Sequence, residues 1–151
     1  WGLYVASTSS GQVDFWRAGN RGFYTVYGSG CQGSLGDEPT VTANSYPTQG
    51  TTNMITWSGM PVSSLCYLGL GLNAAPPLPL TFMGAPDCTL DHDLLLPAYA
   101  GTTTSTGTYV FSAPVPNAPS LAGFGIQFQI LSVDTGAPGG VMTSPAVAWR
   151  F

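Results

Sequence analysis

Hydrophobic and polar residues alternate along much of this chain with the period of two that is typical of β-strands. The clearest case is the segment 124–130, where phenylalanine and isoleucine occupy every second position and Gly125, Gln127 and Gln129 fill the others. Near the end, Val147 and Trp149 alternate with smaller or polar neighbours in the same way. The pattern predicts strands with one face towards a core and the other towards solvent.

Further candidate strands recur at short intervals and are separated by turn signals rich in Gly and Pro. They are 2–6, 12–17, 22–27, 40–44, 53–57, 65–72, 80–83, 89–95 and 106–112. No window of a dozen residues keeps a helical period without a Gly or a Pro. We therefore expect an all-β fold, an antiparallel β-sandwich or jelly roll of about ten short strands without significant helix.

Aromatic residues crowd the beginning of the chain. Residues 4–24 contain Tyr4, Phe15, Trp16, Phe23 and Tyr24. We expect residues 1–27 to form an added β arm or hairpin that can exchange strands with a neighbour, and residues 28–151 to form the sandwich. Trp57 and Trp149 alternate with strand neighbours and are expected in its core.

The charge content changes the picture of possible partners. Only 7% of residues are charged, against about 25% in a typical domain. The basic residues are Arg17, Arg21 and Arg150, and the formal net charge is −4. Nucleic acids and anionic membranes need a basic face, so neither is an expected partner. No apolar run reaches the 18 residues or more that a membrane span needs, so no membrane insertion is expected.

The cysteines and the first residue indicate the compartment in which the protein is expected to work. The chain has three cysteines, no C-x-x-C pair and a single histidine, which argues for a disulfide rather than zinc. It begins with Trp1, so we expect an exported product, extracellular or at the cell surface, whose signal has been removed. The polar stretch 101–107 reads as a loop and a candidate for O-glycosylation.

Three segments resemble a β-domain that recurs at the C-terminal end of secreted proteins of planctomycetes and similar bacteria. They are 27–34 with the strand 39–43, 77–80 running on through 83–88, and 115–123 continuing through 127–134 to 136–140. Together these segments span residues 28–151, in a consistent order and spacing. The resemblance implies an extracellular β-sandwich-like module with no known activity and transfers no catalytic residue. Residues 1–27 lie outside the resemblance. Cys66 occupies a position where that β-domain has an ordinary apolar strand residue.

The expected disulfide joins Cys31 to Cys88. Both lie in turn-like segments flanked by Gly or Pro and within the motifs of that resemblance. Cys66 lies in an apolar strand, where a buried free thiol behaves as a small hydrophobe. A bridge between Cys66 and Cys88 is the alternative.

The acidic cluster Asp87, Asp91, His92 and Asp93 is the best place to look for chemistry. We expect a solvated polar strand end next to a disulfide, with no cofactor or metal. The alternative is a site for a hard cation such as Ca²⁺, because Asp91 and Asp93 would share a face of the strand, with Asp87 a turn away. No Gly-x-Ser-x-Gly elbow accompanies His92, and the few acids offer no pair across a cleft, so we expect no enzyme.

These observations favour a structural protein, a subunit of a filament, sheath or surface layer that binds other copies of itself through β-strands. A nearly uncharged surface is better suited to being covered by neighbours than to a soluble monomer. The alternative is a module that binds carbohydrate or mediates adhesion, with glycans as partners. Either function would place the contacts at Trp1, Tyr4, Phe15, Trp16 and Tyr24.

Overall fold

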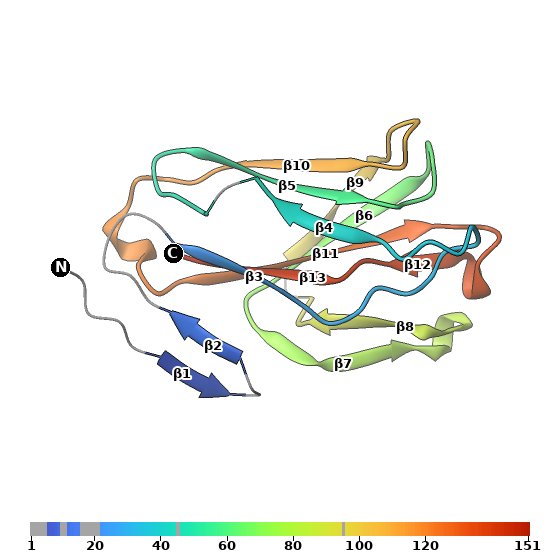
Figure 1. The fold of residues 1–151 in the computed structure, drawn as a ribbon, viewed down its shortest axis with the longest axis horizontal. Coiled ribbons are helices and arrows are strands. Elements are labelled where there is room, and N and C mark those ends of the chain that lie inside the picture. The colour runs from blue at the N-terminus through green and yellow to red at the C-terminus, as the bar shows by residue number, and fades with distance from the viewer. Residues whose placement is uncertain (1–5, 10–11, 16–21, 45, 95) are drawn as a thin grey trace.

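The computed structural model describes residues 6–9, 12–15, 22–44, 46–94 and 96–151. Three stacked layers of β-structure form the body of the fold, and β1 (Ala6–Ser9) and β2 (Gln12–Phe15) form a separate two-stranded sheet beside them (Figure 1). The upper sheet has the order β10 (Tyr109–Pro114), β5 (Thr52–Ser58) and β4 (Thr40–Ala43). The middle sheet has the order β3 (Phe23–Tyr27), β13 (Ala146–Arg150), β11 (Gly125–Val133), β6 (Leu65–Gly71) and β9 (Leu96–Thr102), and β12 (Val141–Thr143) also pairs with β11. The third layer is the hairpin of β7 (Ala74–Leu80) and β8 (Ala85–His92).

The predicted all-β, antiparallel sandwich is confirmed. Every strand pair among the described residues is antiparallel. The helical segments there are three single 3₁₀ turns of three residues each, Thr81–Met83, Pro119–Leu121 and Pro138–Gly140. None of these is long or apolar enough to cross a membrane.

The main core lies between the upper and middle sheets. Trp57 on β5 and Trp149 on β13 are both fully buried there, as the alternation predicts. Phe128 on β11 packs edge-on against Trp149, with 4.9 Å between the ring centroids. Ile130, two residues further along β11, points the same way and has no exposed surface.

The second face of β11 is buried as well, which the alternation does not predict. Gln127 and Gln129 lie on this face and are 0% and 2% exposed, because the β7–β8 hairpin covers them. The Gln129 amide nitrogen donates to the carbonyls of Ser144 (2.8 Å) and Thr89 (3.0 Å), and its oxygen accepts from the Asp91 backbone N–H (2.9 Å). The middle sheet is therefore covered on both sides. The upper sheet packs on one side through apolar side chains, and the β7–β8 hairpin packs on the other side largely through polar groups.

Strand β7 occupies a segment that the Pro residues mark as a turn. It contains Pro76, Pro77 and Pro79, and its one partner among the described strands is β8. Prolines lack the N–H that a ladder needs, so they are tolerated on an edge strand such as this one. Residues 81–83, by contrast, were expected in a strand and form the 3₁₀ turn that closes the hairpin.

The beginning of the described chain contributes to two different sheets. β1 (Ala6–Ser9) and β2 (Gln12–Phe15) pair only with each other. β3 pairs with β13 from Phe23 to Tyr27, so it is an edge strand of the middle sheet. The predicted boundary between arm and sandwich, after Tyr27, would therefore remove β3 from the middle sheet. The independent folding of residues 28–151 stays a prediction.

The disulfide between Cys31 and Cys88 is confirmed. It ties the segment before β4 to β8, across a sequence separation of 57 residues. Cys66 is free and fully buried on β6, facing the main core. The bridge therefore fastens the β7–β8 hairpin to the rest of the fold by a covalent link.

We expect the double variant Cys31→Ala/Cys88→Ala to lose about 2–5 kcal/mol in its free energy of unfolding, because the chain-entropy model gives about 4 kcal/mol for a loop of this length. Urea denaturation of the variant and of Cys66→Ala, which keeps the bridge, provides the measurement and its control. A double variant as stable as the wild type would contradict the expectation.

Candidate functional site

The acidic cluster predicted from the sequence is split by the structure. Asp91 and His92, at the end of β8, are only 2% and 4% exposed and lie between the hairpin and the middle sheet. The His92 ring lies against Gly69 and Gly71 of β6, where a Cβ atom would come within 3.2 Å and 2.8 Å of it. The sheet accommodates this imidazole because two glycines leave room for it. The expectation of a solvent-exposed strand end is therefore wrong for these two residues.

The other two acids of the cluster point elsewhere. Asp93 accepts hydrogen bonds from the backbone N–H groups of Leu72 (2.8 Å) and Asn73 (2.9 Å) and so fastens the start of the hairpin. Asp87 is exposed near the disulfide. Within the described ranges, no three His, Cys, Asp or Glu side chains are grouped closely enough to hold a metal ion.

Burial governs the titration of the enclosed pair. It raises the pKa of Asp91, and the hydrogen bonds from the Thr89 hydroxyl (3.1 Å) and the Gln129 amide (3.3 Å) oppose this only in part. Burial lowers the pKa of His92, and the backbone carbonyl and charge of Asp93 oppose that shift. An imidazole with a lowered pKa that is almost fully enclosed beneath a hairpin acts as a packing element.

The aromatic residues expected to make contacts fall mostly outside the described part of the chain. Trp1, Tyr4 and Trp16 lie outside it, and only the backbone of Phe15, in β2, is described. Tyr24 is half-buried on β3, and its ring lies 6.1 Å from that of the exposed Tyr46.

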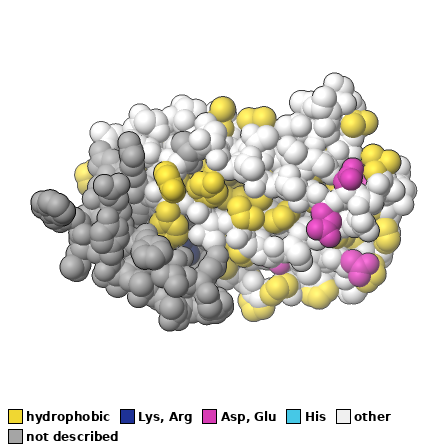
Figure 2. Space-filling view, in the orientation of Figure 1, with side chains coloured by type: hydrophobic (Ala, Val, Ile, Leu, Met, Phe, Trp, Pro, Cys, Tyr) yellow, Lys and Arg dark blue, Asp and Glu magenta, His cyan; other side chains and the backbone are white. Residues whose placement is uncertain are grey.

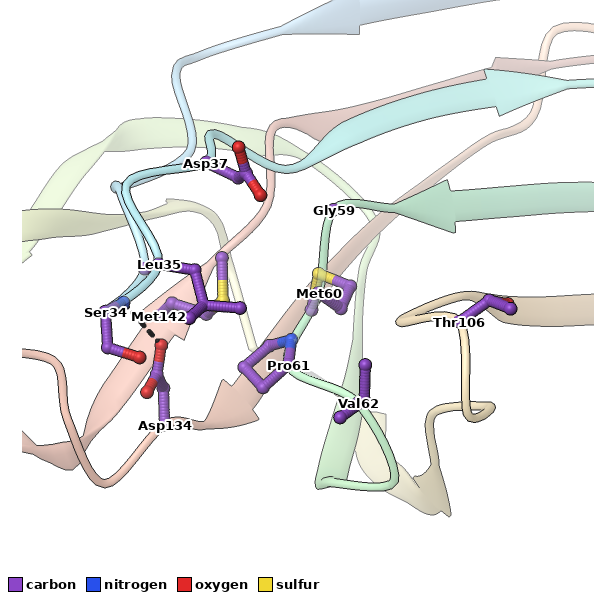
Figure 3. A pocket seen from close by; sticks show the side chains of 11 residues that line it. Ser34, Leu35, Asp37, Gly59, Met60, Pro61, Val62, Thr106, Asp134 and Met142 are labelled. Atoms are coloured by element: carbon purple, nitrogen blue, oxygen red, sulfur yellow. Dashed lines mark hydrogen bonds between the residues drawn. The ribbon is translucent and has the colours of Figure 1, made fainter.

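A more open site lies at the end of the sandwich where the β3–β4, β5–β6, β9–β10 and β11–β12 connections meet (Figure 3). It is a hollow of about 320 Å³, which we call the loop-end hollow. Its lining residues are Gly33, Ser34, Leu35, Asp37, Gly59, Met60, Pro61, Val62, Thr106, Asp134 and Met142.

Leu35 projects from one wall of the hollow and is 79% exposed. The turn that carries it is fixed. The Ser34 N–H donates to Asp134 Oδ2 (2.8 Å), and the Gly33 N–H donates to the Asp37 carbonyl (3.1 Å). Gly36 has a φ of 84°, in the left-handed region that favours glycine. The exposure of Leu35 is thus imposed by an ordered turn.

The opposite wall is fixed in the same way. The Met60 N–H donates to the Gly107 carbonyl (3.0 Å), and the Ser63 N–H donates to the Thr104 carbonyl (3.0 Å). Between these two anchors Val62 is 57% exposed. Two apolar side chains therefore flank the hollow on turns that are already in place before anything binds.

The hollow is also acidic. Asp134 is 6% exposed; burial by itself would raise its pKa, but hydrogen bonds from Ser34 and from the Gly136 N–H (3.2 Å) outweigh burial and lower it. Asp37 stands at the rim and is exposed. Among the described residues the one basic side chain is Arg150, at the end of β13 near the C-terminus, at the other end of the molecule (Figure 1).

Sequence reasoning missed this site because its residues come from separate loops. The available signal was Leu35 itself, a large apolar residue in a turn otherwise composed of small or polar residues, Gly33 to Asp37. The hollow offers apolar contacts and negative charge, which suit the binding of a partner. The chain's single histidine is enclosed elsewhere, so the hollow has no imidazole base.

We expect His92→Gln to reduce the loss of stability at mildly acidic pH. A histidine with a lowered pKa stays neutral when folded, whereas the unfolded chain binds a proton below about pH 6.5. Its contribution is therefore present above that pH and is lost as pH falls towards the folded pKa. Urea denaturation at about pH 7.5 and about pH 5 should show a smaller difference for the variant than for the wild type. Equal differences would contradict this role.

No protein-family model, curated protein or solved structure matches this chain. The resemblance to the planctomycete domain stays a prediction from three motifs, and the function has to be argued from the described surface.

Proposed function

We propose that this chain is an extracellular structural subunit that assembles with copies of itself, end to end, into a filament, sheath or surface layer. The observation that carries the proposal is the kind of surface it has. Fourteen large hydrophobic side chains are exposed among the described residues, against three exposed charged ones, Asp37, Glu38 and Asp87. Such a surface gains free energy when a neighbour covers it, at about 25 cal/mol per Å² of apolar area.

The distribution of charge supports contacts between unlike ends. Figure 2 shows most of the acidic surface of this face at one end of the molecule. Asp37 and Asp134 line the loop-end hollow there, whereas Arg150 lies at the other end. An acidic end that meets a basic end makes a heterologous contact, and repeated contacts of this kind grow into open chains.

Sheet edges and the disulfide add support. Among the described strands, β9 ends the middle sheet on one side, and β4 and β10 end the upper one. A strand from another copy could extend either sheet with main-chain hydrogen bonds. The bridge between Cys31 and Cys88 is of the kind that persists in oxidising, extracellular compartments.

We expect the purified full chain to form particles larger than its 15.7 kDa monomer in a concentration-dependent manner. Deletion of residues 1–21, which keeps β3, should leave a folded monomer. Sedimentation velocity and negative-stain microscopy measure the first effect, and circular dichroism verifies the fold. A full chain that remains monomeric at high concentration would refute the proposal.

Carbohydrate binding is a second candidate, favoured by the pair of Tyr24 and Tyr46. Tyr46 is 58% exposed and packs obliquely beside Tyr24, so one aromatic face is open for a sugar ring to stack on. If this pair binds glycans, Tyr46→Ala should weaken binding on a glycan array about tenfold. Tyr99→Ala is the matched control, because Tyr99 is also 58% exposed. An array without any bound glycan would eliminate this function.

A further inference from the structure

We infer that the loop-end hollow is the acceptor site for the N-terminal segment, residues 1–21, of a second copy of the chain. The inference rests on the proposed self-assembly and names the two surfaces that meet. On the acceptor side, Leu35 and Val62 are held out into solvent by fixed turns. Because these turns are already ordered, binding requires little further loss of conformational freedom.

The hollow suits a bulky apolar anchor. Its volume of about 320 Å³ is at the lower end of the range of pockets that enclose small ligands, so one or two large side chains fill it. Met60 and Met142 contribute flexible, polarisable thioethers to its lining, and these pack favourably against aromatic rings. The expected occupant therefore carries exposed aromatic residues.

The charge at the hollow adds a second requirement. Asp37 lies at the rim, and the lowered pKa of Asp134 keeps that carboxylate ionised at neutral pH. An occupant with a positive charge close to an aromatic residue would satisfy both features of the hollow. The whole chain has three basic residues, so the search within its own sequence is short.

The N-terminal segment meets both requirements. It contains Trp16 next to Arg17, with Phe15 before them and Arg21 after them. The remaining basic residue, Arg150, lies on β13 between the buried Trp149 and Phe151. The Phe151 ring is half-buried and packs edge-on against Trp149, with 6.2 Å between the centroids, so it is already engaged within its own subunit. A second copy of this chain thus has one segment with the composition that the hollow selects.

The fold places donor and acceptor apart. Among the strands that the structure describes, β1 and β2 of this segment pair only with each other, and a two-stranded ribbon is at best marginally stable by itself. Figure 1 shows them at the opposite end of the molecule from the β3–β4 connection that carries Leu35. Contact between two copies would stabilise the ribbon and would leave a free donor and a free acceptor at the two ends of every oligomer.

This arrangement can be tested with two variants, each of which removes one half of the contact. Trp16→Asp disables the donor and keeps the acceptor, whereas Leu35→Asp disables the acceptor and keeps the donor. Each variant alone should be a folded monomer, with the concentration needed for assembly raised about thirtyfold or more, as for loss of a central interface anchor. Mixed together, they should form a 1:1 heterodimer that grows no further, because only one productive contact exists between them.

Sedimentation velocity measures these species, and Leu94→Asp is the matched control. Leu94 is also an exposed leucine, at 54%, but lies outside the hollow, so this variant should assemble like the wild type. A mixture that stays monomeric, or a Leu35→Asp variant that still polymerises, would overturn the inference while leaving self-assembly in place. A monomeric wild type would overturn both.

Discussion

The burial of strand β11 on both faces is the constraint on which the rest of this structure depends. One face carries Phe128 and Ile130 into the apolar core, and the other carries Gln127 and Gln129 under the β7–β8 hairpin. Most buried amides make hydrogen bonds, and Gln129 is the better satisfied of the two. The carbonyls of Thr89 and Ser144 and the backbone N–H of Asp91 supply those of Gln129. The hairpin is thus held in one position by directional bonds that a purely apolar interface would not impose.

The disulfide extends this attachment to the end of the molecule where the hollow lies. Cys31 accepts a hydrogen bond from the Thr143 N–H (3.0 Å) and is bridged to Cys88 on the hairpin. The turn that presents Leu35 begins two residues later. Hairpin, middle sheet and turn are therefore joined at one place, so Leu35 lies close to a covalent and hydrogen-bonded junction of the fold.

How far the sequence predicts this structure depends on which force sets each element. The apolar face of β11 and the burial of Trp57 and Trp149 follow from alternation, because burial of large side chains leaves a periodic trace. The second face of β11 does not, since Gln127 and Gln129 look like solvent-facing residues until the hairpin covers them. Strand β7 was not predicted, because its prolines are typical of turns. The disulfide was predicted from turn-like surroundings and from the motifs of the resemblance, although Cys88 lies within strand β8. The hollow is assembled from four separate connections and leaves no local pattern.

A surface with so few charges creates a problem of specificity as well as of solubility. Apolar contacts alone are not directional, and a chain rich in exposed hydrophobic residues risks disordered aggregation. The prolines of β7 remove N–H donors from one outer strand, which discourages unwanted strand addition there. If copies of the chain dock on one another as we propose, its three basic residues allow few ionic contacts with the acidic end. A docking that leaves the exposed Asp37 without a basic partner would then be disfavoured, so the few charges would add selectivity to the apolar contacts.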